Sequence, residues 1–124
     1  MRASLWALAA LLTAGATAPA LADGDAARGQ TLFSRCSACH TVTDQNKLGP
    51  HLSGVVGRVA GTLPGYTFSR AMVAYAKPWD EPTLDAFLAG PAKAVPGTKM
   101  AAPPISNPQD RADLIAYLKT VPAS

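Results

Sequence analysis

The feature that most constrains this 124-residue chain is the run Cys36-Ser37-Ala38-Cys39-His40. A pair of cysteines separated by two residues and followed at once by a histidine is the attachment pattern for c-type haem. Each thiol can add to one vinyl group on adjacent edges of the porphyrin. The next residue then lies beneath the iron, where an imidazole can bind axially. The run therefore predicts one covalent haem c, attached at Cys36 and Cys39, with His40 as an iron ligand.

Other uses of a C-x-x-C pair fit this chain less well. A thioredoxin-like site would need a surrounding βαβ pattern, which is absent from the sequence. A four-ligand zinc site would need two more ligands at short spacing, and only His51 is available. A plain disulfide would be usual for two cysteines in an exported chain, but the histidine that follows favours haem.

The N-terminus has the three parts of a secretory signal. Arg2 gives a positive start, residues 5–12 form an uncharged apolar run, and Ala20 and Ala22 are the small residues that a signal peptidase reads. The apolar run is too short to cross a bilayer, which takes roughly 20 residues. We therefore predict a signal peptide over 1–22, cleaved after Ala22, rather than a retained anchor or a buried helix.

The remaining residues, 23–124, have the length of one domain with a modest core. The whole chain carries a formal net charge of +3, to which Arg2 in the predicted signal contributes one. No run of Lys or Arg exceeds a single residue, so the charge does not indicate nucleic-acid binding. We expect a periplasmic monomer without stable membrane insertion.

Three side chains compete for the sixth position on the iron. Met100 lies in a Val-Pro-Gly-Thr-Lys-Met stretch, in which proline and glycine predict a rigid loop that can aim a thioether at a metal. Met72 lies in a short helical pattern, where packing in the core is the more ordinary role. His51 follows His40 too closely to reach the opposite haem face and is expected at the surface. The residues alone favour Met100 as the sixth ligand but do not exclude Met72.

The rest of the pattern predicts an all-α chain of a few short helices and long loops. No strand alternation persists, and loops this long are unusual in so small a domain unless a large prosthetic group supplies the core. Asp25 is expected in the first helical turn, while Asp80 and Asn107 are expected as N-caps. Helices are predicted over 24–35, 69–75, 79–88 (ended by Gly90-Pro91) and 107–119, with loops over 41–57, 61–65 and 101–106.

An ordered set of further motifs runs along the chain from about 24 to 120. The set consists of Gly29, Phe33, 36–42, 47–52, 54–58, Gly61, 64–67, Trp79, 83–84, 96–100 and 111–118. With these motifs the chain resembles the class I cytochromes c, in particular the mitochondrial-like and bacterial cytochrome c2 group. The resemblance implies the cytochrome c fold, wrapped around one covalently bound haem.

The resemblance also implies roles for single residues. Met100 would be the sixth iron ligand, and the Pro50 carbonyl would accept a hydrogen bond from the ring N–H of His40. Arg58 and Trp79 would bond the inner haem propionate. Where the first and last helices cross, Gly29 and Phe33 would pack against Leu114 and Tyr117.

The chain departs from the family at several positions. Phe68 stands where a propionate-binding tyrosine is usual, and Phe87 where a tyrosine usually bonds the methionine sulfur; Tyr66 lies near Phe68 but has no assigned partner. Ala102 replaces an aromatic residue two positions after the methionine, so we expect a more open haem edge. The usual ring of lysines is thinned; Arg35, Lys47, Lys93 and Lys99 are among the cations that remain.

If His40 and Met100 fill both axial positions of the iron, the protein would be a diffusible one-electron carrier and not an enzyme. The haem edge near the two cysteines would be the electron exit, and the remaining cations would steer the protein to an acidic partner surface. Expected partners are a bc1-type complex, a terminal oxidase, a photosynthetic reaction centre or a periplasmic dehydrogenase. One alternative is a dedicated electron-accepting subunit of a periplasmic dehydrogenase. Another is a haem enzyme or gas sensor with a labile sixth position.

Overall fold

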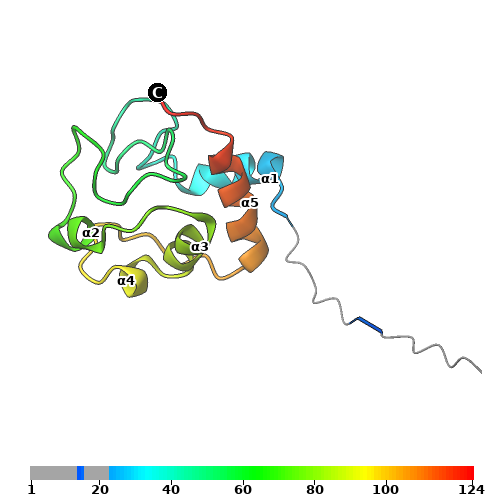
Figure 1. Cartoon of the computed structure of the whole chain (residues 1–124). Coiled ribbons are helices and arrows are strands. Elements are labelled where there is room, and N and C mark those ends of the chain that lie inside the picture. Colours follow the sequence, from blue (N-terminus) through cyan, green and yellow to red (C-terminus); the bar gives the residue numbers. More distant parts are fainter. Residues whose placement is uncertain (1–13, 16–22) are drawn as a thin grey trace, which may run out of the picture.

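The computed structural model describes residues 14–15 and 23–124, so nearly all of the predicted signal peptide lies outside the described residues. Helices and irregular loops make up the described part (Figure 1), and its one β-bridge, between Val59 and Pro78, stands alone. The predicted all-α class is confirmed. The helices are α1 (Ala26–Leu32), the 3-10 turn η1 (Phe33–Arg35), α2 (Arg70–Tyr75), α3 (Glu81–Ala89), α4 (Pro91–Ala94) and α5 (Pro108–Lys119).

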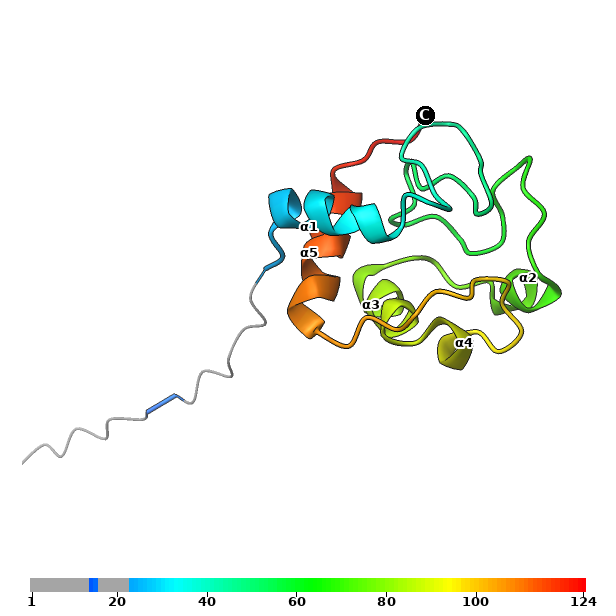
Figure 2. The same cartoon turned by 180° about the vertical axis from the view of Figure 1, so that it is seen from behind.

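The first and last helices of the fold pack directly on each other. Figures 1 and 2 show α1 beside α5 from opposite sides of the molecule. Gly29 is buried in this crossing, where a Cβ added to it would lie 2.8 Å from the Cβ of Tyr117 and closer still to the carbonyl oxygen of Asp113. The rings of Phe33 and Tyr117 pack with centroids 5.6 Å apart. The predicted contact between these helices is confirmed.

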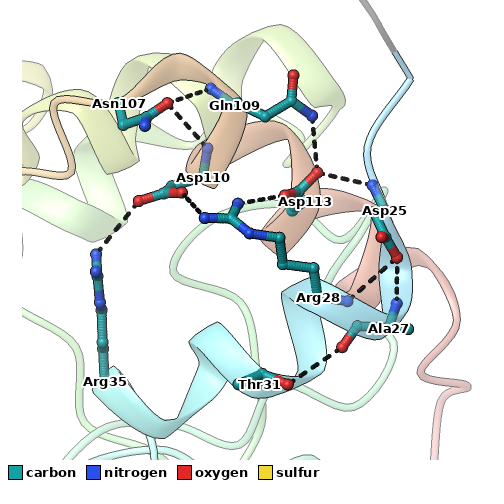
Figure 3. Close-up of polar contacts among 9 residues, drawn as sticks. All are labelled: Asp25, Ala27, Arg28, Thr31, Arg35, Asn107, Gln109, Asp110 and Asp113. Carbon is teal, nitrogen blue, oxygen red and sulfur yellow. Dashed lines mark hydrogen bonds and ion pairs between the residues drawn. The ribbon is translucent and has the colours of Figure 1, made fainter.

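Charged groups from both helices tie this crossing together (Figure 3). One nitrogen of the Arg28 guanidinium donates to Asp113 at 2.5 Å, and another donates to Asp110 at 2.7 Å. The Asp113 carboxylate also accepts from the backbone N–H of Asp25 at 2.7 Å and from Gln109 at 2.9 Å. These bonds hold the pKa of Asp113 below its ordinary value, the Asp25 N–H having the largest effect. The buried carboxylate is thus fully partnered.

Capping side chains set where the helices begin. Asp80 accepts from the N–H of Thr83 at 2.9 Å, and Asn107 accepts from Gln109 at 2.8 Å, as predicted for N-caps. The expectation that Asp25 lies in the first turn was wrong. Its carboxylate accepts from the N–H groups of Ala27 and Arg28, so Asp25 is itself the N-cap of α1.

Helix α4 was not predicted from the sequence. Gly90-Pro91 does end α3, as expected, but Gly90 is also the residue from which α4 starts. Proline is well suited to the first helical position, because its missing N–H would have no partner there and its φ is already helical. A single Gly-Pro pair therefore both stops one helix and starts the next.

Hydrogen bonds fix the long loops between α1 and α2. The N–H of Gly49 donates to the carbonyl of Cys39 at 2.8 Å, and the N–H of Leu52 donates to Thr41 at 2.8 Å. The Tyr66 hydroxyl donates to the carbonyl of Leu48 at 2.8 Å.

Within the part of the chain that the structure describes, no helix combines the length and apolar character needed to cross a membrane.

Candidate functional site

A cavity of about 790 Å³ lies at the centre of the fold, between the loops that follow η1 and the segments around α2 and α3. Its volume falls in the range of roughly 300–1,000 Å³ that is usual for cofactor sites. Most of its wall is apolar and includes Phe33, Leu52, Val55, Leu84 and Leu114. Every residue proposed from the sequence to hold the haem lines it: Cys36, Cys39, His40, Pro50, Arg58, Trp79 and Met100.

The two cysteines reach the cavity because the chain turns tightly after η1. The N–H of Cys36 donates to Phe33 at 2.8 Å, and the N–H of His40 donates back to Cys36 at 2.9 Å. Both thiols are half-buried and free of any disulfide. Burial raises the pKa of the Cys36 thiol, although nearby Arg35 opposes that effect. One turn of backbone therefore presents two thiols and an imidazole to the same space.

The ring of His40 is held from two sides. Its Nδ1 lies 2.7 Å from the Pro50 carbonyl oxygen, which can only accept, so Nδ1 carries the proton and Nε2 keeps its lone pair. Gly49 lies against the ring: a Cβ added there would be 2.5 Å from Cε1. Burial lowers the pKa of His40 and so favours the neutral imidazole that a metal requires. The family resemblance implied the bond to Pro50 but not the need for glycine at 49.

Arg58 and Trp79 come together although they lie far apart in the sequence. The N–H of Trp79 donates to the Arg58 carbonyl at 2.9 Å, beside the bridge between Val59 and Pro78. The guanidinium of Arg58 is half-buried and donates to the carbonyls of His51 and Ser53 at 3.2 and 3.3 Å. Burial lowers the pKa of Arg58, but a guanidinium stays protonated, and it places a cation at the cavity wall.

Both candidate methionines line the cavity, from different kinds of structure. Met72 belongs to α2 and is buried among core side chains. Met100 is half-buried in a loop whose turn uses Gly97 at φ +90°, and its N–H donates to the Thr98 hydroxyl at 3.2 Å. Lys99 anchors the same loop by donating to the carbonyl of Thr67. The wall of the cavity thus offers a thioether on a fixed loop as well as one on a helix.

The positions where the chain departs from the family that it resembles also line the cavity. Phe68 packs edge-on against Tyr66, with centroids 4.8 Å apart, and the Tyr66 hydroxyl is already bonded to Leu48. Phe87 is buried against Trp79 at a centroid distance of 4.9 Å. Ala102 adds only a methyl group to the wall. Phe68 and Phe87 therefore keep the wall apolar, whereas Ala102 leaves the wall without the aromatic ring that is usual in the family at this position.

The expectation that His51 is a surface residue holds only in part. Its side chain is half-buried, and Nδ1 lies 2.7 Å from the hydroxyl of Ser53. That hydroxyl also lies 2.7 Å from the hydroxyl of Ser124, so the end of the chain folds back onto this loop. A contact over such a sequence separation has no local signal by which it could have been predicted.

The side chains around the cavity fit a haem. Thiols with the attachment spacing, an imidazole with a free Nε2, a thioether and a mostly apolar wall are the groups that such a cofactor requires. No group of three or more His, Cys, Asp or Glu suited to a bare metal ion occurs among the described residues.

Comparisons with known proteins agree with this geometry. The family model described as Cytochrome c matches residues 26–122. A cytochrome c2 of Rhodomicrobium vannielii is 46% identical over 106 residues, which cover 84% of this chain and 85% of the relative. A cytochrome c of Gossypium barbadense is 48% identical over 99 residues, 77% of this chain and 89% of that one. The solved structure of cytochrome cH from Methylobacterium extorquens is similar at a TM-score of 0.76 and 50% identity, covering 78% of this chain and 99% of that chain.

Proposed function

The chain belongs to the cytochrome c family, and from that premise we propose that it carries single electrons on a haem whose iron His40 and Met100 would bind. As a member of the family it is an electron carrier with one covalent haem c. Cys36 and Cys39 would make the covalent attachment. Their spacing supports this assignment, and so does the position of both residues in the wall of the cavity. The single observation that carries the proposal is the cavity lined by both thiols, the oriented imidazole and the thioether.

When bound, the haem supplies an iron that cycles between two oxidation states and so takes up and releases one electron. The protein's part is to hold the ligands still. His40 is fixed by the Pro50 carbonyl and by the close backbone of Gly49, so its Nε2 keeps one direction. An imidazole that is held in this way needs little rearrangement between the two oxidation states, and hydrogen bonding to Nδ1 also raises its strength as a ligand.

We propose that Met100 would be the second protein ligand of the iron. Its loop is anchored by Thr98 and by Lys99, whereas Met72 is packed into the core from α2. A thioether is a soft ligand that favours the reduced iron and raises the reduction potential. If His40 and Met100 both bound the iron, no substrate would reach it, and the protein would act as a carrier rather than as an enzyme.

We also propose that the protein works in the periplasm as a monomer that moves between membrane complexes. The support is the secretory pattern over residues 1–22 and the set of exposed cations Arg35, Lys47, Lys93 and Lys99. Such charges accelerate the encounter with an acidic partner and lose their effect as salt is added. A bc1-type complex, a terminal oxidase, a reaction centre or a periplasmic dehydrogenase would provide such a surface.

Optical spectroscopy of the haem-loaded protein tests the ligand set. The ferric form is expected to show the near-infrared charge-transfer band of a methionine–iron bond. Met100→Ala should abolish the band and lower the reduction potential by on the order of 0.1 V, within the range of about 0.8 V that axial ligands span. Met72→Ala is the matched control and should keep the band. A native protein without the band at neutral pH, or a Met100→Ala variant that retains it, would show that the ligand assignment is wrong.

A further inference from the structure

The residues that follow α5 lie against a loop from the first half of the chain. We call residues 121–124 the tail and residues 51–54 the support loop. Both views of the fold show the end of the chain beside the loops that follow η1 (Figures 1 and 2). The N–H of Gly54 donates to the carbonyl of Val121 at 3.3 Å. The tail therefore returns to a segment that is distant from it in the sequence.

Gly54 allows the tail to approach this closely. Its φ of +64° lies in the left-handed region, which favours glycine. A Cβ added to Gly54 would lie 2.7 Å from the Cβ of Ala123 and 2.8 Å from its Cα. The tail therefore packs directly on the backbone of the support loop, with no room for a side chain between the two segments.

The Ser53 side chain joins the same two segments and takes no part in the site described above. Ser53 is only 4% exposed, and it does not line the central cavity. Its hydroxyl lies 2.7 Å from Nδ1 of His51 and 2.7 Å from the hydroxyl of Ser124. A buried hydroxyl that loses a partner destabilises the structure around it. Ser53 and the tail therefore hold each other in place.

The support loop also fixes Arg58, which does line the central cavity. The Arg58 guanidinium donates to the carbonyl oxygens of His51 at 3.2 Å and of Ser53 at 3.3 Å. The His51 end of the loop has a support of its own, because the side chain of Asn46 accepts from the His51 N–H at 2.9 Å. The Ser53 end is the end on which the tail packs. The contact between the tail and Arg58 therefore passes through Ser53.

We propose that the tail, acting through Ser53, positions Arg58 and thereby raises the reduction potential of the bound haem. This inference rests on the proposed function and adds to it a positioning residue that lies outside the cavity wall. A cation at the wall disfavours the extra positive charge of the oxidised haem, so it raises the potential. When the Ser53 carbonyl moves, the guanidinium loses one of its two fixed partners and its charge is better screened by water. Detaching the tail should therefore lower the potential.

Substitutions at the serine pair test the proposal in the haem-loaded protein. Ser53→Ala removes the hydroxyl that joins the loop to the tail and should lower the reduction potential, measured by redox titration. Amide hydrogen exchange at Gly54 in the reduced protein should become about fivefold faster, as expected for the loss of one hydrogen bond. Ser124→Ala should act in the same direction from the exposed side. Ser124→Thr keeps a hydroxyl and should behave like the native protein.

A double-substitution cycle separates positioning from a general loss of stability. Arg58→Lys cannot make the two-pronged contact with the support loop, so adding Ser53→Ala to it should lower the potential no further. Asn107→Ala removes the N-cap at the other end of α5 and is the matched control. It should lower the stability of the protein and leave the potential unchanged.

Three results would overturn the proposal. The first is unchanged exchange at Gly54 in Ser53→Ala and Ser124→Ala, and the second is faster exchange with an unchanged potential. The third is an equal fall of the potential in the Arg58→Lys background, because the effect would then bypass Arg58. If Ser53→Ala does not fold, the variants at the exposed Ser124 decide. The near-infrared band of the native sample is recorded in parallel, and its absence would contradict the iron ligation and not the role of the tail.

Discussion

The α1–α5 crossing and the Met100 side of the cavity are built in opposite ways. At the crossing, two helices touch through Gly29 with no space for an added methyl group, and a buried ion-pair cluster joins them. On the Met100 side the chain is a loop fixed at a few points, and it leaves a hollow beside Ala102. The crossing is held by contacts within the chain, whereas the loop is placed around a cofactor.

The difference separates the framework from the adjustable part of the molecule. The framework positions η1, and with it Cys36, His40 and one side of the cavity. The opposite side carries the proposed methionine ligand and the positions where this chain departs from its family. Changes at the crossing should therefore alter whether the protein folds, and changes on the loop should alter what it binds and at what potential.

The largest effect is expected for Gly29→Ala. The new Cβ would force the backbone of α5 away, and overpacking of this kind costs up to about 3 kcal/mol of unfolding free energy. Gly90→Ala is the matched control, because an added Cβ there would lie 3.4 Å from its nearest neighbour and meet no strain. Denaturant unfolding of the haem-loaded protein measures both. Equal, small decreases in the unfolding free energy of the two variants would show that the crossing is not tightly packed.

An intermediate effect is expected for Asp113→Asn. The Asp113 pKa is lowered in the folded protein by the Asp25 N–H, Arg28 and Gln109. Its stabilisation is therefore complete above the ordinary carboxyl pKa of about 3.9 and is lost as the pH falls through the lower folded value. Asp113→Asn should lower the stability at neutral pH and flatten the acid limb of the stability curve. Asp44→Asn, an exposed carboxylate outside the cluster, should change neither. An acid limb of unchanged slope in Asp113→Asn would contradict the assignment.

The smallest effect, and of opposite sign, is expected for Ala102→Phe. A ring placed in an existing apolar hollow removes apolar surface from water without forcing neighbours apart, so the unfolding free energy should rise by about 1 kcal/mol. The same ring at residue 74, on the exposed side of α2, should add little. A loss of stability in Ala102→Phe would show that the loop is as tightly packed as the crossing.

The sequence predicted those features that depend on neighbours in the chain. The attachment run needs only the spacing of Cys36, Cys39 and His40, and the caps Asp80 and Asn107 act on residues within one helical turn. The resemblance to a family added the bond from His40 to Pro50 across a loop. Helix α4 was not predicted, because a Gly-Pro pair is usually interpreted as the end of a helix, although the same proline can begin the next helix.

Features that depend on distant partners could not be predicted. Nothing near Asp113 in the sequence indicates that it will be buried against Arg28, 85 positions away. The close approach of Gly49 to the His40 ring depends on a loop conformation that no periodicity encodes. A second cavity of about 360 Å³ beside the Met100 loop is formed by three segments at once, because Leu88, Pro91 and Ile105 all line it.

The wide sequence separation within the α1–α5 crossing also bears on how such a chain is made. A helix whose partner comes 85 residues later remains unpaired until nearly all of the polypeptide has been synthesised. If the chain is threaded through a membrane from its N-terminus, α1 and the two thiols that follow it emerge long before α5 does. The proposed attachment of a haem to these thiols would then have an interval in which to take place, before the last helix packs against the first.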